Sequence, residues 1–270
     1  MKPIAVVRGA GDLATAVGRR LHLCGFSVAH LEIAQPTVIR RTVAFASAVF
    51  RGQVTVEGVE AVLAPDVAAA RWLLEQGRVA VLIDPEAASI ESLRPVLVVD
   101  AILAKRNLGT RLDMAPRVVA LGPGFEAGVD VHAVVETCRG HDLGRVYTSG
   151  GARPDTGVPG AIGGVGAERV LRAPADGTIR PSKDIGQMVK PQELVAEVDG
   201  VPLRSTIGGV LRGILHSGLS VFKGQKVADV DPRGDPSLCF TISDKANAVA
   251  GGVLEAAFRE GAGRSLVTME

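Results

Sequence analysis

Short, uninterrupted apolar runs separated by an amphipathic stretch open the chain. Residues 4–7 and 27–33 are rich in β-branched and aliphatic side chains. Between them, apolar residues recur at helical spacing from Leu13 to Cys24, just before Gly25. Such runs are typical of parallel strands buried on both faces, and a glycine in this place is typical of a helix end. The pattern predicts a strand, a helix and a second strand in succession.

The alternation continues to about residue 138. Residues 53–62 alternate polar and apolar positions around Glu57-Gly58, which is typical of a β-hairpin. Further strands are expected at 79–83, 94–103 and 118–121. Helices are expected at 37–50 with Thr37 as cap, at 64–77 with Pro65 in the first turn, and at 129–138. Strands that alternate with helices favour an α/β fold with a mostly parallel, Rossmann-like sheet.

The turn after the first strand carries a candidate phosphate site. Residues 9–14 match the G-x-G-x-x-G/A pattern, in which small residues permit a tight turn and the approach of an anion to the backbone. Glu32 follows 23 residues after Gly9, close to the roughly 20-residue offset at which an acid meets a ribose hydroxyl. The residues expected to bind a ligand are Gly9, Ala10, Gly11, Asp12, Leu13 and Glu32.

A second interpretation of this turn remains open. Its glycines could serve only close packing in an ordinary βαβ turn, with Glu32 as a solvated charge at a strand end. Asp12 adds a difficulty, because a carboxylate beside a phosphate repels it unless that carboxylate caps the helix or binds a metal.

Polar residues gather after the expected strand at 94–103. Lys105 and Asn107 follow it and could bind an anion or an enolate-like oxygen, since open α/β sheets bind ligands beyond the carboxyl ends of their strands. The alternative is a polar loop. Arg40 lies just beyond the strand that ends near Glu32, where a guanidinium could meet a phosphate, or it is a solvated helix charge.

Three further positions are weaker candidates. Gly122 and Gly124 precede the helix expected at 129–138 and could present free amides to a phosphate, or form a Gly-Pro turn. His141 beside Asp142 could transfer a proton, although a histidine in a turn is more often structural. Cys138 could be a reactive thiol, but its place on the expected helix favours a buried, inert one.

Composition narrows the function classes. Lys plus Arg number 30 against 29 Asp plus Glu, and aromatic residues make up 3%, so neither charge nor base stacking favours nucleic acid as a partner. The three cysteines show no disulfide or zinc spacing, and no metal site is expected. No apolar run reaches the length of a membrane helix. We expect a cytoplasmic protein that engages neither membrane nor nucleic acid.

From residue 170 the pattern changes to a repeat of short strands. Residues 170–198 and 204–230 follow one plan: a strand, a loop, a turn with Gly and Lys, then an apolar strand. The stretch 171–230 resembles the biotinyl/lipoyl-type barrel-sandwich hybrid, most clearly at 173–177 and 221–227. The resemblance places the acceptor lysine where Gly200 stands, which implies that no biotin or lipoate is attached.

The expected organisation is therefore a Rossmann-like α/β domain at 1–168 with a glycine-rich loop region at 139–168. A small all-β hybrid domain at 169–235 follows, then a helix at about 246–260 with Gly261 as its stop, and a tail.

As a whole, the chain resembles the YqeB-like accessory proteins of the selenium-dependent molybdenum hydroxylase system. The segments that carry the resemblance are 7–14, 39–43, 100–107, 121–125, 139–144, 154–160 and 171–177. The resemblance implies a role in the maturation of a molybdenum hydroxylase, in contact with that enzyme or its other maturation factors. It supplies no established reaction and leaves self-association open.

Three hypotheses follow. The first is a maturation factor that binds a nucleotide or a molybdopterin-type phosphate ligand at the glycine loop, with Lys105 and Asn107 at the reacting end. The second is an NAD(P)-dependent oxidoreductase that uses the same cleft, with Lys105 or His141 handling a proton. The third is a non-enzymatic scaffold that docks a partner through the hybrid domain.

Overall fold

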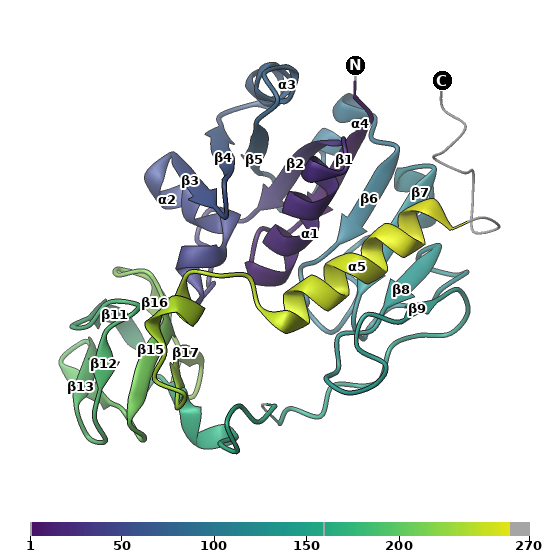
Figure 1. The fold of residues 1–270 in the computed structure, drawn as a ribbon. Helices are drawn as coiled ribbons and strands as arrows, with labels where there is room; N and C mark the ends of the chain where they lie inside the picture. The colour runs from purple at the N-terminus through teal and green to yellow at the C-terminus, as the bar shows by residue number, and fades with distance from the viewer. Residues whose placement is uncertain (1, 159, 260–270) are drawn as a thin grey trace. The chain divides into compact units, whose positions relative to one another are not determined.

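The computed structural model describes residues 2–158 and 160–259, and its contacts divide the chain into two compact units. The first unit comprises Met1–Pro36, Ala44–Asp155 and Ile242–Glu270, and the second comprises Thr37–Val43 and Thr156–Thr241. Residues 156–168 thus lie in the second unit, and the C-terminal helix lies in the first. Figure 1 follows the chain through both units.

Within the described residues, the first unit is built on a nine-stranded sheet in the order β3-β4-β5-β2-β1-β6-β7-β8-β9. All neighbours from β4 to β8 are parallel, and only the edge strands β3 and β9 pair antiparallel. The predicted α/β fold with a mostly parallel sheet is confirmed. The strands are β1 (Ile4–Arg8), β2 (Ser27–Glu32), β3 (Gln53–Val56), β4 (Val59–Ala64), β5 (Val79–Ile83), β6 (Leu97–Asp100), β7 (Arg117–Leu121), β8 (Ala133–Val135) and β9 (Val146–Tyr147).

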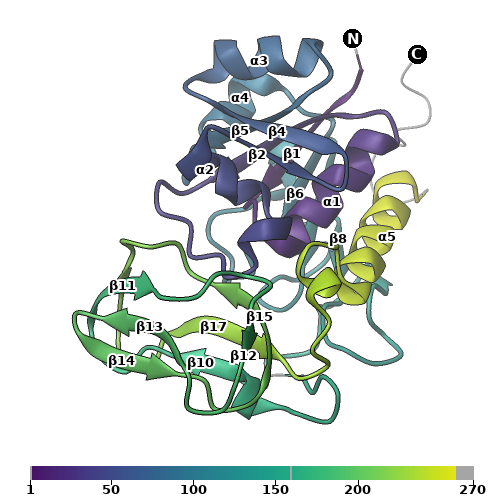
Figure 2. The same ribbon diagram turned by 60° about the vertical axis from the view of Figure 1, so that its left-hand side comes forward.

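Helices cover both faces of this sheet. One face is covered by α1 (Asp12–Leu23) and α5 (Asp244–Phe258), which pack against each other (Figure 1). The other carries α3 (Val67–Glu75) and α4 (Ser89–Leu93), whose leucines and isoleucine join the strands in one apolar core (Figure 2). The short α2 (Ala48–Arg51) precedes the β3–β4 hairpin. No helix among the described residues is both long enough and apolar enough to cross a membrane.

The second unit consists of two four-stranded antiparallel sheets, ordered β10-β17-β15-β12 and β14-β13-β11-β16. The repeat seen in the sequence agrees with this arrangement: the third of four strands in each copy pairs with the second strand of the other copy, β12 with β15 and β16 with β11. The strands are β10 (Val170–Arg172), β11 (Gly177–Pro181), β12 (Met188–Val189), β13 (Leu194–Val198), β14 (Val201–Arg204), β15 (Gly209–Ile214), β16 (Ser220–Val221) and β17 (Lys226–Asp231).

The turn between β13 and β14 is the hairpin in which the resemblance places an acceptor lysine. It consists of Asp199 and Gly200, both with positive φ, as a tight two-residue hairpin requires.

Two expected helices are wrong. Residues 129–138 contain β8 instead, because Ala133–Val135 is buried throughout and pairs with β7. Residues 37–50 form two short 3-10 turns and α2 rather than one helix. The reason is that the chain bonds to β15 of the second unit on the way: Ile214 N donates to Ile39 O at 2.8 Å.

Other boundaries shift by a few residues. Helix α3 begins at Val67 because Asp66 caps it, accepting a hydrogen bond from Ala69 N at 2.8 Å, so Pro65 precedes the helix instead of opening it. The strand expected at 94–103 is only Leu97–Asp100, since Arg94 adopts a left-handed conformation. The C-terminal helix is Asp244–Phe258, and its expected stop at Gly261 lies outside the described residues.

Candidate functional site

The order of the first unit's strands marks one edge of the sheet as the candidate site. β1 lies between β2 and β6, so the chain builds outward from β1 first on one side and then on the other. Open parallel sheets bind ligands beyond the carboxyl ends of the strands at such a reversal. Here those ends are Arg8 of β1, Glu32 of β2 and Asp100 of β6.

The glycine turn after β1 is held tightly. Gly9 has φ +94° and lies so close to the loop after β6 that a Cβ would be 3.0 Å from Ala101 O. Its amide donates to Leu31 O at 2.6 Å, and Ala10 O accepts from Ala46 N at 2.8 Å. Gly11 precedes α1 and has no side chain to cap the first amides of the helix. The turn is closely packed, and its second glycine is the N-cap of α1.

Glu32 lies directly beside this turn, as its offset from Gly9 predicts. Its Oε2 accepts from Ala10 N and its Oε1 from Ile33 N, both at 2.8 Å. Burial raises the pKa of this half-buried carboxyl, and the two backbone hydrogen bonds partly oppose the rise. The amide of Ala10, one of those expected to bind phosphate, is therefore already hydrogen-bonded to Glu32. Of the residues expected to bind the ligand, Gly11, Asp12 and Leu13 at the start of α1 remain.

A second helix begins at the same edge. Ser243 caps α5 by accepting from Ala246 N at 3.2 Å. Lys245, in the first turn of α5, interacts electrostatically with Asp12 in the first turn of α1. Near the other ends of the two helices, Phe26 and Phe258 have ring centroids 6.0 Å apart. The helices run side by side in the same direction (Figure 1). Two positive helix ends therefore lie at the carboxyl edge of the sheet.

Lys245 is a further cation near this edge, and no motif in the sequence marks it. Burial lowers the pKa of its ammonium, the charge of Arg139 acts in the same direction, and the carboxylates of Asp12 and Glu136 and the thiol of Cys138 oppose them. A lysine near the start of a helix is unremarkable in a sequence. Only the packing of α5 on α1 brings it to the carboxyl edge.

The loop after β8 contributes to the same edge. The buried carboxylate of Glu136 accepts from the amides of Thr137 and Cys138, each at 2.7 Å, and of Arg153 at 2.9 Å. Arg139 grips Asp244 at the start of α5 with two hydrogen bonds of 2.8 and 3.1 Å. Cys138 is exposed on this loop, so the expectation of a buried thiol on a helix is wrong.

The two residues expected at the reacting end are engaged elsewhere in the loop after β6. Asn107 closes its own turn, with Oδ1 accepting from Thr110 N at 2.8 Å and Nδ2 donating to Thr110 O at 2.9 Å. Lys105 is exposed and forms an ion pair with Asp155. Their assigned roles remain predictions.

Arg8 and Asp100 form a buried ion pair, bridged by Thr110, where β1 meets β6. Arg8 Nη1 lies 3.6 Å from Asp100 Oδ2, and Thr110 Oγ1 donates to that oxygen and accepts from Arg8, both at 2.5 Å. Arg8 also donates to Leu108 O at 3.0 Å and Pro85 O at 3.4 Å. Burial raises the pKa of Asp100, against the hydrogen bonds from Thr110 and Ile102 and the charge of Arg8.

The remaining candidates have different surroundings. A Cβ on Gly122 would be 2.7 Å from Thr137 Oγ1 and one on Gly124 2.6 Å from the backbone of Arg106, so both glycines meet close packing, and the helix expected after them is absent from this part of the described chain. His141 is exposed. Arg40 belongs to the second unit, where its Nη2 donates to Leu238 O and Thr241 O.

Among the described residues, no three His, Cys, Asp or Glu side chains gather as a metal site.

Comparison with known proteins gives one strong relation. No family model matches the chain. Solved structures show a weak likeness: succinylglutamate desuccinylase/aspartoacylase of Rhodobacter sphaeroides (14% identity, 85% of both chains, TM-score 0.25) and the product-bound ectoine utilization protein EutE of Ruegeria pomeroyi (12%, 85% of both chains, TM-score 0.26). Scores this low support no argument.

In contrast, the chain is 52% identical over 253 residues to the Escherichia coli K12 protein named "Uncharacterized protein YqeB". The match covers 94% of this chain and 47% of that protein, so the chain spans about half the length of the relative. The YqeB likeness expected from the motifs is thus present as sequence similarity along nearly the whole chain.

Proposed function

We propose that the first unit binds a nucleotide or a molybdopterin-type phosphate ligand at the carboxyl edge of its sheet. Through this ligand the protein would serve as a maturation factor for a molybdenum hydroxylase. The observation that carries the binding proposal is the position of Glu32, whose Oε2 lies 2.8 Å from Ala10 N of the glycine turn. A carboxylate held there offers its remaining lone pairs to the hydroxyls of a ribose.

Three features support the phosphate part of the ligand. Helices α1 and α5 both begin at this edge, and a helix N-terminus attracts anions through its amides and its dipole. Gly11 leaves the first turn of α1 open to close approach, and its φ of −66° is one that other residues adopt. Lys245 adds a cation that responds to the charge of Asp12, which answers the difficulty of a carboxylate beside an anion.

The maturation role rests on the motifs shared with the YqeB-like accessory proteins and on the similarity to YqeB itself. A cofactor that carries a phosphate, with or without an attached nucleotide, has the groups that Glu32 and the helix ends would recognise. The hydroxylase or its other maturation factors would be the protein partners.

An NAD(P)-dependent oxidoreductase is the second candidate, and Glu32 is the observation that favours it. An acid in this position pairs with the ribose of NAD and repels the 2′-phosphate of NADP. The candidate is weaker, because Lys105 forms an ion pair and His141 is exposed.

Ligand-dependent unfolding of the full chain tests these proposals. Nucleoside di- and triphosphates, NAD, NADP and isolated molybdopterin are compared, and a ligand at 100 times its dissociation constant should stabilise the first unit by about 2.7 kcal/mol. Stabilisation by NAD alone favours the oxidoreductase, and stabilisation by molybdopterin or other nucleotides favours the maturation factor. A response to none of them contradicts both and favours a scaffold.

Two variants locate the site. Gly11→Val adds a side chain at the helix start, at a φ that valine can adopt, and should abolish the shift. Glu32→Gln removes the charge that would bind the ribose and should weaken binding about tenfold. Glu91→Gln, at an exposed position of α4, is the matched control and should bind normally. Undiminished binding by Gly11→Val would place the ligand elsewhere.

A further inference from the structure

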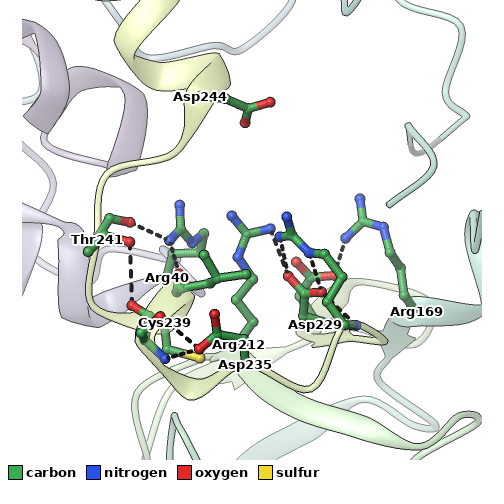
Figure 3. Close-up of polar contacts among 12 residues, drawn as sticks. Arg40, Arg169, Arg212, Asp229, Asp235, Cys239, Thr241 and Asp244 are labelled. Atoms are coloured by element: carbon green, nitrogen blue, oxygen red, sulfur yellow. Dashed lines mark hydrogen bonds and ion pairs between the residues drawn. The ribbon is translucent and has the colours of Figure 1, made fainter. Parts of the chain in front are cut away.

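Arginines gather on one side of the second unit. The group, here called the arginine row, consists of Arg40, Arg169, Arg212 and Arg233. Figure 3 shows the side chains of Arg40, Arg212 and Arg169 extending to the same side of the sheet, with Asp229 between the last two. Arg40, Arg169 and Arg212 are buried, which is unusual for arginine outside a paired or ligand-binding position.

Three members of the row have evident structural partners, and those of Arg40 are the carbonyl oxygens of Leu238 and Thr241. Arg169 pairs with Asp229 and donates to Gly160 O at 3.0 Å from Nη2 and 3.3 Å from Nε. Arg233 grips Asp231 through Nε at 2.9 Å and Nη2 at 2.6 Å. Burial raises the pKa of Asp231, but the hydrogen bonds and charge of Arg233 outweigh it, so the carboxyl is held ionised with a lowered pKa.

Arg212 is aimed into the row by an irregularity of β15. In the pairing of β15 with β17, Leu211 lies opposite Val230 and Gly213 opposite Asp229, which makes Arg212 the extra residue of a β-bulge. Gly213 permits this geometry, because a Cβ there would be 2.9 Å from Ile39 O. Bulges redirect a side chain and are common beside functional sites.

The guanidinium of Arg212 is left poorly satisfied. The residue is 6% exposed, and its Nε has no hydrogen-bond partner among the described residues. Its Nη1 lies 3.7 Å from Asp231 Oδ2, beyond hydrogen-bond distance, and both oxygens of that carboxylate already serve Arg233. A buried donor without a hydrogen bond is costly, and the only carboxylate that pairs with Arg212 among the described residues is shared with Arg233, so a further acceptor would stabilise this guanidinium.

We propose that the arginine row binds a phosphoryl group, with Arg212 as its central ligand. A guanidinium presents planar, paired N–H donors that match two phosphate oxygens, and a tetrahedral phosphoryl group can meet several guanidinium groups at once. The group would come either from free phosphate or from the diphosphate of a nucleotide. This site lies within the second unit, so it stands whether or not the glycine turn of the first unit binds a ligand.

Titration calorimetry of the full chain tests the proposal with three probes: inorganic phosphate, inorganic pyrophosphate and ADP, all at constant ionic strength. Binding of phosphate identifies a free-phosphate site, and binding of pyrophosphate and ADP without phosphate identifies a diphosphate site. Arg212→Gln should weaken binding about tenfold or more, since it removes charge-assisted hydrogen bonds. Arg212→Lys, which keeps the charge and loses the fork, should fall between the two.

Controls separate this site from others. Arg180→Gln removes an exposed arginine of β11 in the same unit and should bind as the unaltered chain does. The part of the binding that Arg212→Gln removes should persist in Gly11→Val, because the glycine turn belongs to the first unit. Circular dichroism and a thermal melt first establish that each variant is folded. No binding of any probe, or equal binding by Arg212→Gln and Arg212→Lys, would overturn the proposal.

Discussion

Two buried arginine–aspartate pairs, one in each unit, are alike in distance and burial but differ in the hydrogen bonds that the arginine makes. Arg8 lies 3.6 Å from Asp100 and Arg212 lies 3.7 Å from Asp231, and the two arginines are 3% and 6% exposed. Arg8 uses its remaining donors on a hydroxyl and two carbonyl groups, whereas the Nε of Arg212 has no partner in the described chain.

The distance within an ion pair therefore does not show whether the buried arginine has a structural or a ligand-binding role. Arg8 stands at the strand reversal, where the topology of the sheet points to a ligand, yet both of its Nη atoms donate to protein oxygens and it joins the end of β1 to the loop after β6. Arg212 lies in a small all-β unit whose strand order does not indicate a ligand site. The two arginines differ in whether the N–H groups that do not face the paired aspartate find other hydrogen-bond acceptors.

The largest effect is expected from Arg8→Met. It leaves the Asp100 carboxylate buried beside Thr110 without its cation, and losing one partner of a buried pair costs about 3–5 kcal/mol. Denaturant unfolding of the first unit measures this cost. Arg78→Met is the control, since the half-exposed Arg78–Glu60 pair contributes about 1 kcal/mol or less. Equal losses in the two variants would remove the distinction drawn for Arg8.

An intermediate effect is expected from His30, a buried side chain with only one satisfied nitrogen. Nδ1 lies 2.9 Å from Gly9 O, whereas Nε2 has no partner among the described residues. Burial lowers the pKa of His30 to about 4, and the hydrogen bond to Gly9 only partly opposes it. Below pH 6.5 the imidazole of His30 binds a proton in the unfolded chain but stays neutral in the folded chain. The free energy of unfolding should therefore fall by about 3 kcal/mol between pH 6.5 and 4.

Unfolding free energies measured across that pH range check this prediction against His30→Leu. The variant cannot take up the proton, so its curve should be flatter by the contribution of His30, while the carboxylates titrate in both proteins. Parallel curves would mean that the histidine is protonated in the folded state.

The smallest effect on stability is expected from Arg212→Met. Replacement of a poorly satisfied buried charge by an apolar side chain is often neutral or stabilising, and Asp231 retains Arg233, so the change should lie within about 1 kcal/mol. Chemical denaturation of the second unit gives the value. A loss as large as that for Arg8→Met would assign Arg212 a structural role and weaken the case for an anion.

The sequence predicted the first βαβ unit, the parallel sheet and the internal repeat because each leaves a local pattern. It also placed Glu32 beside the glycine turn, through a spacing that the strand and helix lengths impose. It could not show that Glu32 takes the amide of Ala10, which depends on a side-chain rotamer. The helix expected at 129–138 fails because the short apolar run of Ala133–Val135 suits a buried strand as well as a helix.

Long-range packing accounts for the rest. Lys245 joins the edge of α1 although 233 positions separate it from Asp12, and no local pattern encodes that meeting. Arg40 follows Glu32 closely in sequence, but no local pattern shows that the chain passes into the second unit at Thr37. The bulge at Arg212 likewise depends on the register of β15 against β17.

The early departure of Thr37–Val43 into the second unit has a consequence for biosynthesis. The carbonyl of Ile39 leaves the ribosome long before Ile214, the residue whose amide it accepts. Neither unit can therefore be completed from one uninterrupted stretch of nascent polypeptide. A fragment of residues 156–241 alone would lack the segment that accepts the hydrogen bond of Ile214. Adding residues 37–43 as a separate peptide should restore this contact and stabilise the fragment.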